Sequence, residues 1–273
     1  MSDVRPPAVA GRFYPGHPEE LRRMVEGMLA DAAGEPGPAV AAIVPHAGLI
    51  YSGACAARVF KRIHLPSAVV ILAPNHTGYG DNVGGAGAWD RGAYGTPLGT
   101  QAVAADFLSR LEAECDLVAH DPSAHLYEHA VEVELPFITL LAPDAQVAPI
   151  VLAWDDWGSC KELADALVRA ISASEQDVLL LASSDMTHYE SADSAASKDR
   201  MALEAVERLD GRELLATCRR EKVSMCGRAP AAVVLETARQ LGAERAELVD
   251  YRHSGWVTGD DSSVVAYAGV VIS

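Results

Sequence analysis

The hydrophobic positions of the chain fall into alternating blocks with two different spacings. Between residues 17 and 34, apolar residues recur every three or four positions, as on one face of a helix. Residues 39–45 form a continuous apolar run instead, as expected of a strand that is covered on both faces. The same alternation predicts further helices over 53–63, 101–114, 128–142, 159–171, 194–209, 211–220 and 228–241, and further strands over 67–74, 146–152, 177–183, 246–253 and 262–272.

Alternation of strands and helices is typical of an α/β domain. No internal repeat or low-complexity linker divides the chain. We therefore predict a single domain, residues 1–273, with a mainly parallel or mixed central sheet between helical layers. The glycine-rich stretch from Thr77 to Thr100 interrupts the pattern and is predicted to be a hairpin or a long loop, which could act as a lid. Pro136 should kink or divide the helix predicted over 128–142.

Charge and cysteine content narrow the classes of partner. The chain has 38 acidic and 22 basic residues, a formal net charge of -16. Phosphate backbones and anionic membranes attract basic surfaces, so neither nucleic acid nor a membrane is an expected partner. No stretch approaches the roughly 18 apolar residues of a membrane span, and the N-terminus lacks a signal-peptide pattern. Five widely spaced cysteines without a CxxC pair favour the reducing cytoplasm over a disulfide framework. The oligomeric state stays open.

Polar residues directly follow three of the predicted strands. These residues are His46, His76 and Asp185, with His188 three positions after Asp185. In open α/β sheets, ligands bind in the crevice beyond the carboxyl ends of the strands. If the three strands are parallel neighbours, their polar residues should meet in one crevice. The alternative for each histidine alone is a loop residue that satisfies backbone groups.

Two further segments offer chemistry. The segment "EHAVEVELPF" carries Glu128, His129 and Glu132 near a predicted helix start. Cys226 precedes the helix predicted over 228–241, and the positive end of a helix favours the thiolate, which binds metals. Each residue also has a structural interpretation when it is taken alone. Cys226 can be a small buried hydrophobic residue, and Glu132 can be a solvated position on a helix. No local metal-binding motif such as HExxH is present, so the argument depends on the convergence of separate segments.

Six short motifs follow one another along the chain: "PHAG" (45–48), "APNH" (73–76), "EHAVEVELPF" (128–137), "SSDMTHY" (183–189), "CGRAP" (226–230) and "DSSVVAYAG" (261–269). These motifs resemble those of the Memo family, whose bacterial and archaeal members are called AmmeMemoRadiSam system protein B. They span nearly the whole chain in the order of the family, after an opening "AGRFYP". Some relatives have a histidine where Thr77 and Ala229 stand here. The family shares its fold with the class III extradiol dioxygenases, which are non-haem iron enzymes, so the resemblance implies a class III extradiol dioxygenase-like α/β fold.

The resemblance implies a centre for one metal ion, with iron favoured and copper and zinc as alternatives. Its metal ligands would be His46, His76 and Cys226. Two histidines and one anion on one face leave open positions for substrate and oxygen, as in the 2-His-1-carboxylate iron oxygenases. Here the anion would be the Cys226 thiolate, and Glu132 or Asp185 is the alternative anionic ligand.

The remaining pocket residues would carry catalysis. His129 and His188 match the positions of active-site histidines in the wider dioxygenase group, and Asp185 belongs to the same pocket motif. His188 is the candidate general base, because an imidazole titrates near neutral pH. Asp185 would orient one imidazole and fix its tautomer, as carboxylates beside metal ligands commonly do.

Two functions of different classes remain. The first is a metal-dependent oxidoreductase of the dioxygenase type. The second is a non-catalytic module that uses the same crevice to bind a metal ion, a peptide or a partner protein. A thiol hydrolase is a third interpretation and requires direct contact between Cys226 and His188 without a metal between them. The resemblance also implies a functional link to a radical-SAM protein, while the small-molecule or peptide ligand stays open.

Overall fold

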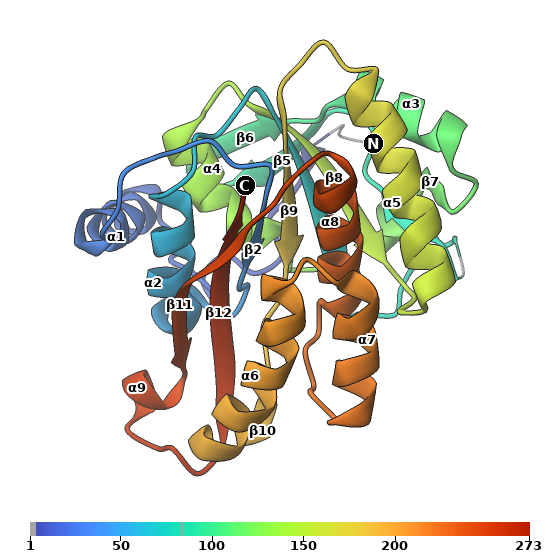
Figure 1. The fold of residues 1–273 in the computed structure, drawn as a ribbon. Coiled ribbons are helices and arrows are strands. Elements are labelled where there is room, and N and C mark those ends of the chain that lie inside the picture. The colour runs from blue at the N-terminus through green and yellow to red at the C-terminus, as the bar shows by residue number, and fades with distance from the viewer. Residues whose placement is uncertain (1–3, 83) are drawn as a thin grey trace.

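A mixed β-sheet runs through the centre of the protein (Figure 1). The structure is a computed structural model that describes residues 4–82 and 84–273. Its central strands are the continuous apolar runs of the sequence. Within the described residues, the strand order is β10 (His188–Glu190), β12 (Val264–Ile272), β2 (Ala41–Val44), β9 (Val178–Ser183), β3 (Ala68–Pro74), β8 (Gln146–Leu152), β4 (Ala86–Ala88) and β7 (Val118–His120), with β11 (Ala246–His253) paired to β12.

The middle of this sheet is parallel and its margins are antiparallel. Strand β9 lies between β2 and β3 and runs parallel to both, and β3 runs parallel to β8. On the two sides, β12 is antiparallel to β2, and β4 is antiparallel to β8. The predicted α/β fold with a mixed sheet is therefore confirmed. Because β2, β9 and β3 are parallel neighbours, the residues that follow them emerge at the same edge of the sheet.

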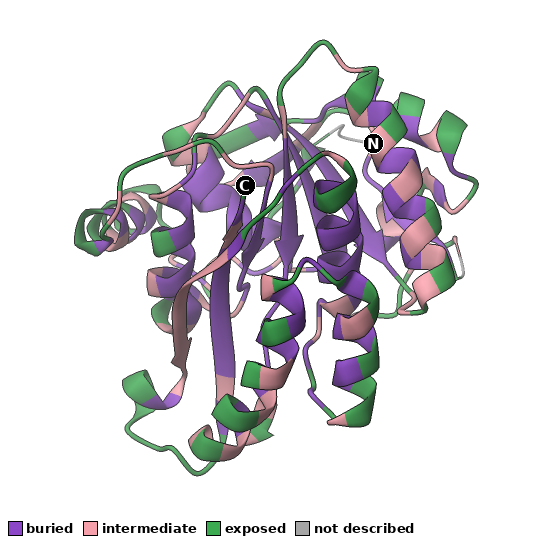
Figure 2. Ribbon diagram, viewed as in Figure 1, coloured by how far each residue is buried: buried purple, intermediate pink, exposed green. Residues whose placement is uncertain are grey.

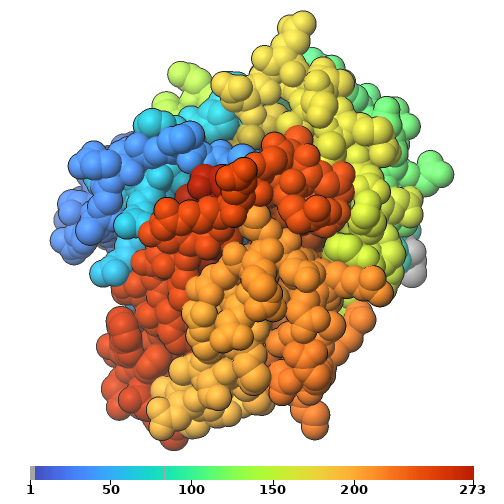
Figure 3. All heavy atoms as spheres, viewed as in Figure 1, coloured from blue at the N-terminus to red at the C-terminus, as the bar shows by residue number. Residues whose placement is uncertain are grey.

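Two groups of helices flank the sheet. Helices α5 to α8 pack against one another and lie in front of the sheet in the view of Figure 1, whereas α1, α2 and α4 pack together as the second group. Seen as spheres, the chain from α6 onward covers much of the front face (Figure 3). The helices are α1 (Pro18–Asp31), α2 (Leu49–Phe60), α3 (Ala105–Glu114), α4 (Leu135–Leu141), α5 (Trp157–Ser172), α6 (Ala192–Glu207), α7 (Gly211–Arg220), α8 (Arg228–Gln240) and α9 (Gly255–Thr258), with 3-10 turns at Pro122–Ala124 and Glu132–Glu134.

Two predicted helices begin later than their sequence pattern indicated. The residues before α3 form β6 (Gly99–Ala102), which pairs with β5 (Ala93–Thr96) in an antiparallel hairpin. This hairpin lies in the glycine-rich stretch, as predicted, and forms a small second sheet with β1 (Val4–Arg5). The helix predicted from residue 128 is divided, because α4 starts at Leu135. Pro136 occupies the first turn of α4, where a missing N–H removes no helical hydrogen bond.

The central strands consist mostly of buried residues, drawn in purple in Figure 2. Every residue of β2 and β3 is buried, as the continuous apolar runs predicted. One ion pair, Arg5 with Glu132, is also fully buried. Within the described part of the chain, no helix is both long and apolar enough to span a membrane.

Candidate metal centre

Three histidines from separate segments meet at the carboxyl edge of the parallel strands. His46 follows β2, His76 follows β3, and His129 precedes the 3-10 turn before α4. One potential ligand atom from each lies within 4.8 Å of the other two. The ring centroids of His46 and His76 are 5.1 Å apart. Those of His129 lie 5.3 Å from His46 and 4.6 Å from His76. His46 and His76 thus lie as close together as the strand ends predicted, and His129 completes a three-histidine group.

Each ring of the three-histidine group has its Nδ1 atom next to an oxygen atom. His46 Nδ1 lies 2.7 Å from the hydroxyl oxygen of Ser183, and His76 Nδ1 lies 3.0 Å from Glu128 Oε1. His129 Nδ1 lies 3.3 Å from the same carboxylate oxygen. A metal-binding imidazole commonly donates its other N–H to such an oxygen. This leaves three Nε2 atoms as donors, a set that fits zinc, copper or iron.

Glu128 organises two of these rings, and the sequence singled it out only as a neighbour of His129. Its carboxylate accepts hydrogen bonds from the backbone N–H of His76 at 2.7 Å, of His129 at 2.8 Å and of Ala130 at 2.9 Å. Burial raises the pKa of Glu128, but the hydrogen bond and the charge of His76 outweigh it and lower the pKa below its ordinary value. The ionised carboxylate therefore fixes both the rings and their backbone.

Two of the three imidazoles are neutral at neutral pH. Burial lowers the pKa of His46 well below 6.5, and the neighbouring histidines lower it further. Burial also lowers the pKa of His129, to about 4. The pKa of His76 is raised, because its hydrogen bond with Glu128 and the charge of that carboxylate outweigh burial. Since metal binding requires the neutral imidazole, His46 and His129 are ready to bind, whereas His76 is the ring most inclined to release a proton on binding.

A cavity of about 500 Å³ adjoins the three-histidine group. Asp185 and His188, the other two residues that we predicted to be catalytic, also line this cavity. Asp185 Oδ1 accepts hydrogen bonds from the backbone N–H of His46 at 2.9 Å and of Ala47 at 3.3 Å. We predicted that Asp185 orients an imidazole ring, whereas these contacts hold the backbone that carries His46. Burial raises the pKa of Asp185 to about 7.

His188 lies on the wall of the same cavity, outside the three-histidine group. Its Nδ1 is 3.1 Å from the carbonyl oxygen of Ser224, and its backbone N–H donates to the Ser224 hydroxyl at 2.8 Å. The Ser224 carbonyl can only accept, so Nδ1 carries the ring proton and Nε2 carries the lone pair. Burial lowers the pKa of His188, so the ring is neutral at neutral pH and can accept a proton.

Cys226 contacts His46, one member of the three-histidine group. Its Sγ is 3.3 Å from His46 Nε2 and accepts the Asp185 backbone N–H at 3.2 Å. We expected the start of α8 to lower the pKa of this thiol. Instead burial raises it, and the charge of Asp185 adds to the increase. The residue precedes the Gly227 cap, so the first turn of the helix does not compensate for lost hydration. Its role as a ligand stays a prediction.

The contacts of Cys226 also bear on the thiol-hydrolase interpretation. That interpretation requires the thiol to contact His188, whereas the imidazole in hydrogen-bonding range of Sγ is that of His46. The Nδ1 atom of His188 faces Ser224 instead. A Cys226–His188 pair is therefore not formed in this arrangement.

Comparison with known proteins agrees with the motifs. A family model described as "Memo-like protein" matches residues 5–271. The chain belongs to the Memo family. It is 39% identical over 269 residues to the MEMO1 family protein of Aquifex aeolicus and 37% identical over 280 residues to that of Methanopyrus kandleri, with 98% of each chain covered in both cases. An uncharacterized protein of Escherichia coli K12 has a solved structure with a TM-score of 0.48 at 15% identity, over 85% of this chain and 99% of that chain.

Glu132 is not available as a metal ligand in this Memo protein, so this alternative was wrong. Its buried carboxylate is ion-paired with Arg5 and accepts a hydrogen bond from the Tyr14 hydroxyl. It also accepts the backbone N–H of Ala8 at 2.7 Å and of Val9 at 3.0 Å. The solvated helix position that we considered is equally wrong. The residue ties the N-terminal segment to the segment that carries His129.

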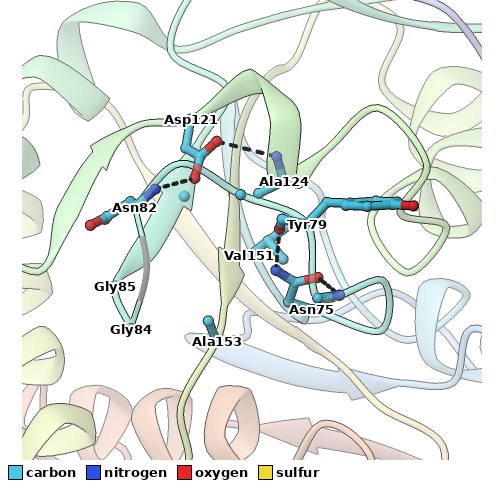
Figure 4. A pocket seen from close by; sticks show the side chains of 12 residues that line it. Asn75, Tyr79, Asn82, Gly84, Gly85, Asp121, Ala124, Val151 and Ala153 are labelled. Atoms are coloured by element: carbon cyan, nitrogen blue, oxygen red, sulfur yellow. Dashed lines mark hydrogen bonds between the residues drawn. The ribbon is translucent and has the colours of Figure 1, made fainter.

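The glycine-rich stretch lines a separate cavity (Figure 4). Asn75 donates a hydrogen bond to the Tyr79 carbonyl at 2.7 Å, and Asp121 accepts the Asn82 backbone N–H at 2.8 Å. These bonds hold the stretch around a cavity of about 260 Å³. Apart from residue 83, which lies outside the described residues, no residue from 77 to 99 lines the histidine cavity. A lid role for this stretch stays a prediction.

Proposed function

We propose that this Memo family protein binds one metal ion between His46, His76 and His129 and acts as a metal-dependent oxidoreductase on a small organic molecule. The supporting observation is that three imidazole donors adjoin a cavity of about 500 Å³. Three protein ligands on one side of a metal leave positions for substrate and oxygen. Iron is the favoured metal, with copper and zinc as alternatives. When bound, the metal would supply oxygen activation and polarisation of the substrate.

The walls of the histidine cavity favour an aromatic ligand. Phe13, Tyr51 and Tyr267 line it together with the histidines. Aromatic side chains pack well against a flat ring, while a few polar groups fix its orientation. His188 would accept the proton of a substrate hydroxyl at Nε2, since Ser224 occupies its other nitrogen. Ring cleavage of a catechol by oxygen places both oxygen atoms in the product, so such a substrate requires no further electron donor.

The second candidate function is non-catalytic binding of a metal ion, with the cavity open to a peptide or a partner protein. Cys226 favours it, because its Sγ lies 3.3 Å from His46 Nε2. A thiol so close to a metal would be at risk of oxidation during turnover with oxygen. A protein that only binds metal is not exposed to that risk. A link to a radical-SAM protein is compatible with either function.

Oxygen uptake separates the two functions. The untagged protein would be reconstituted without oxygen, first with Fe(II) and then with Cu(I), and oxygen consumption measured with and without a panel of catechols. We expect uptake that depends on the organic substrate, is lost in His46→Ala and persists in His17→Ala, a control at an exposed histidine. Tight metal binding without uptake for either metal would favour the binding function. Absence of metal binding would reject both.

A further inference from the structure

Ser183, the last residue of β9, links three segments beneath the metal centre. Its buried hydroxyl oxygen lies 2.7 Å from His46 Nδ1, 2.8 Å from the carbonyl oxygen of Ala130 and 2.8 Å from Glu134 Oε1. Glu134 is itself fully buried and contacts none of the three histidines through a hydrogen bond within the described residues. The chain of contacts therefore runs from a buried carboxyl group through a hydroxyl group to a metal-ligand candidate.

The protons of this chain can be counted. A serine hydroxyl donates one hydrogen bond and accepts two. The Ala130 carbonyl can only accept, so the arrangement that satisfies all three contacts sends the hydroxyl proton to Ala130. His46 Nδ1 and Glu134 Oε1 must then both donate to Ser183. In this arrangement His46 is protonated at Nδ1, with its lone pair on Nε2, and Glu134 is a neutral carboxylic acid.

Independent features of Glu134 agree with a neutral carboxyl group. Its second oxygen, Oε2, is buried and has no hydrogen-bond partner within the described residues. An ionised carboxylate with a bare buried oxygen is far more costly than a neutral one. Burial raises the pKa of Glu134 well above 4.5 despite its hydrogen bond with Ser183, and the charge of Asp185 adds to the increase. By contrast, Glu128 and Glu132 in the same segment face histidines or an arginine.

We propose that Glu134, acting through Ser183, is a positioning residue of the metal centre that holds His46 with its Nε2 lone pair at the meeting point of the three imidazoles. Without the proton donated by Glu134, one of the three contacts that fix the Ser183 hydroxyl is lost, and only its bond to the Ala130 carbonyl keeps it from turning toward His46 Nδ1. That rotation stabilises the other tautomer of His46, whose Nε2–H cannot bind a metal. The inference rests on the proposed metal binding and extends it to a residue outside the ligand set.

The test compares two substitutions of Glu134. In Glu134→Gln, the amide N–H replaces the carboxyl proton as the donor to Ser183. In Glu134→Met, the donor is lost while the length of the side chain is nearly kept. The matched control is Glu112→Met, at a carboxyl group on α3 whose Oε1 is also buried without a partner and whose pKa burial also raises. Circular dichroism and thermal melts establish that each variant folds.

Two readouts are needed, and one of them is independent of metal. Nitrogen-detected imidazole NMR of the metal-free protein reports the tautomer of His46, and competition titration with Co(II) reports metal affinity. We expect one tautomer in the wild type, in Glu134→Gln and in Glu112→Met, with Kd values within about threefold of one another. We expect a tautomer mixture in Glu134→Met and a Kd weakened about 10- to 100-fold, as for other residues that orient metal ligands.

Each alternative result is decisive. A single tautomer and an unchanged Kd in Glu134→Met would overturn the proposal. Equal loss in Glu134→Gln and Glu134→Met would also overturn it, because the donated proton would then not be the cause. If the wild type bound no Co(II), the proposed metal binding would fail. The NMR comparison would still support the positioning role if Glu134→Met alone lost the single tautomer, and would reject that role if it did not.

Discussion

Substitution of Arg5 by methionine tests whether the buried ion pair holds the N-terminal segment against the metal centre. The Arg5 guanidinium pairs with the Glu132 carboxylate and donates hydrogen bonds to the carbonyl oxygens of His125 and Glu128. Methionine keeps much of the apolar volume but removes every donor. The buried Glu132 is left with a charge that no cation faces.

The expected loss of stability follows from these contacts. Removing one partner of a buried ion pair costs about 3–5 kcal/mol. Glu132 keeps its hydrogen bonds from Tyr14, Ala8 and Val9, which reduces that cost. The two carbonyl groups lose their donor at about 1 kcal/mol each. We therefore expect a decrease of about 4 kcal/mol in the free energy of unfolding, a large part of the 5–15 kcal/mol typical of a domain.

The assay is urea unfolding of the metal-free protein at neutral pH, followed by circular dichroism. The control is Arg200→Met, because Arg200 on α6 is 52% exposed and pairs with the exposed Glu204 and the half-buried Glu207. Such surface pairs contribute about 0–1 kcal/mol. Because Arg5 binds the Glu128 carbonyl directly before His129, we also expect Arg5→Met to weaken Co(II) binding about tenfold. The double variant Arg5→Met/Glu132→Met should recover part of the lost stability, since no charge is then left buried alone.

A loss in Arg5→Met within about 1 kcal/mol of that in Arg200→Met would refute the reasoning, because surface pairs contribute only about 0–1 kcal/mol. A double variant as unstable as the single one would show that removing the unpaired charge gains no more than is lost when Tyr14, Ala8 and Val9 no longer have the Glu132 acceptor.

Three further predictions concern pH, the thiol and the backbone. Burial raises the pKa of Asp199 from 3.8 to about 6, so its contribution to stability is present below pH 3.8 and is lost as the pH rises through about 6. From pH 4 to pH 6 the wild type should therefore lose about 2 kcal/mol relative to Asp199→Asn, and parallel stability curves would contradict this. Cys226→Ser should fold normally and bind Co(II) at least about tenfold more weakly by competition titration; an unchanged Kd would leave the three-histidine group as the complete ligand set. A Cβ at Gly227 would collide with the Ser183 carbonyl, so Gly227→Ala should lower the free energy of unfolding by about 2–4 kcal/mol in urea, and a wild-type value would show that α8 can shift.

Much of the fold could be predicted from short-range patterns. The predicted strands 146–152 and 246–253 and the predicted helix 211–220 agree with β8, β11 and α7 residue for residue. The proximity of His46 and His76 also follows from the sequence, because both residues come directly after strands that read as buried and parallel. The Memo motifs were sufficient to predict the family.

Other features were decided by the tertiary structure alone. Residues 101 and 102 belong to β6 because β5 is available as a partner, although their sequence reads as the start of a helix. His129 joins the three-histidine group because Glu128 ties its backbone to that of His76.

The side chains that support the candidate site show the physical reason. Glu128, Glu132 and Glu134 are three carboxylates in one short segment with no distinguishing pattern, yet one binds histidines, one binds Arg5 and one binds Ser183. The pattern of buried positions in a helix or strand depends on residues that are close in the sequence. The sequence by itself therefore determines the strands, most of the helices and the strand ends that carry His46 and His76. Charge states and hydrogen-bond partners depend on desolvation and on groups more than 40 positions away, which only the packed chain brings together.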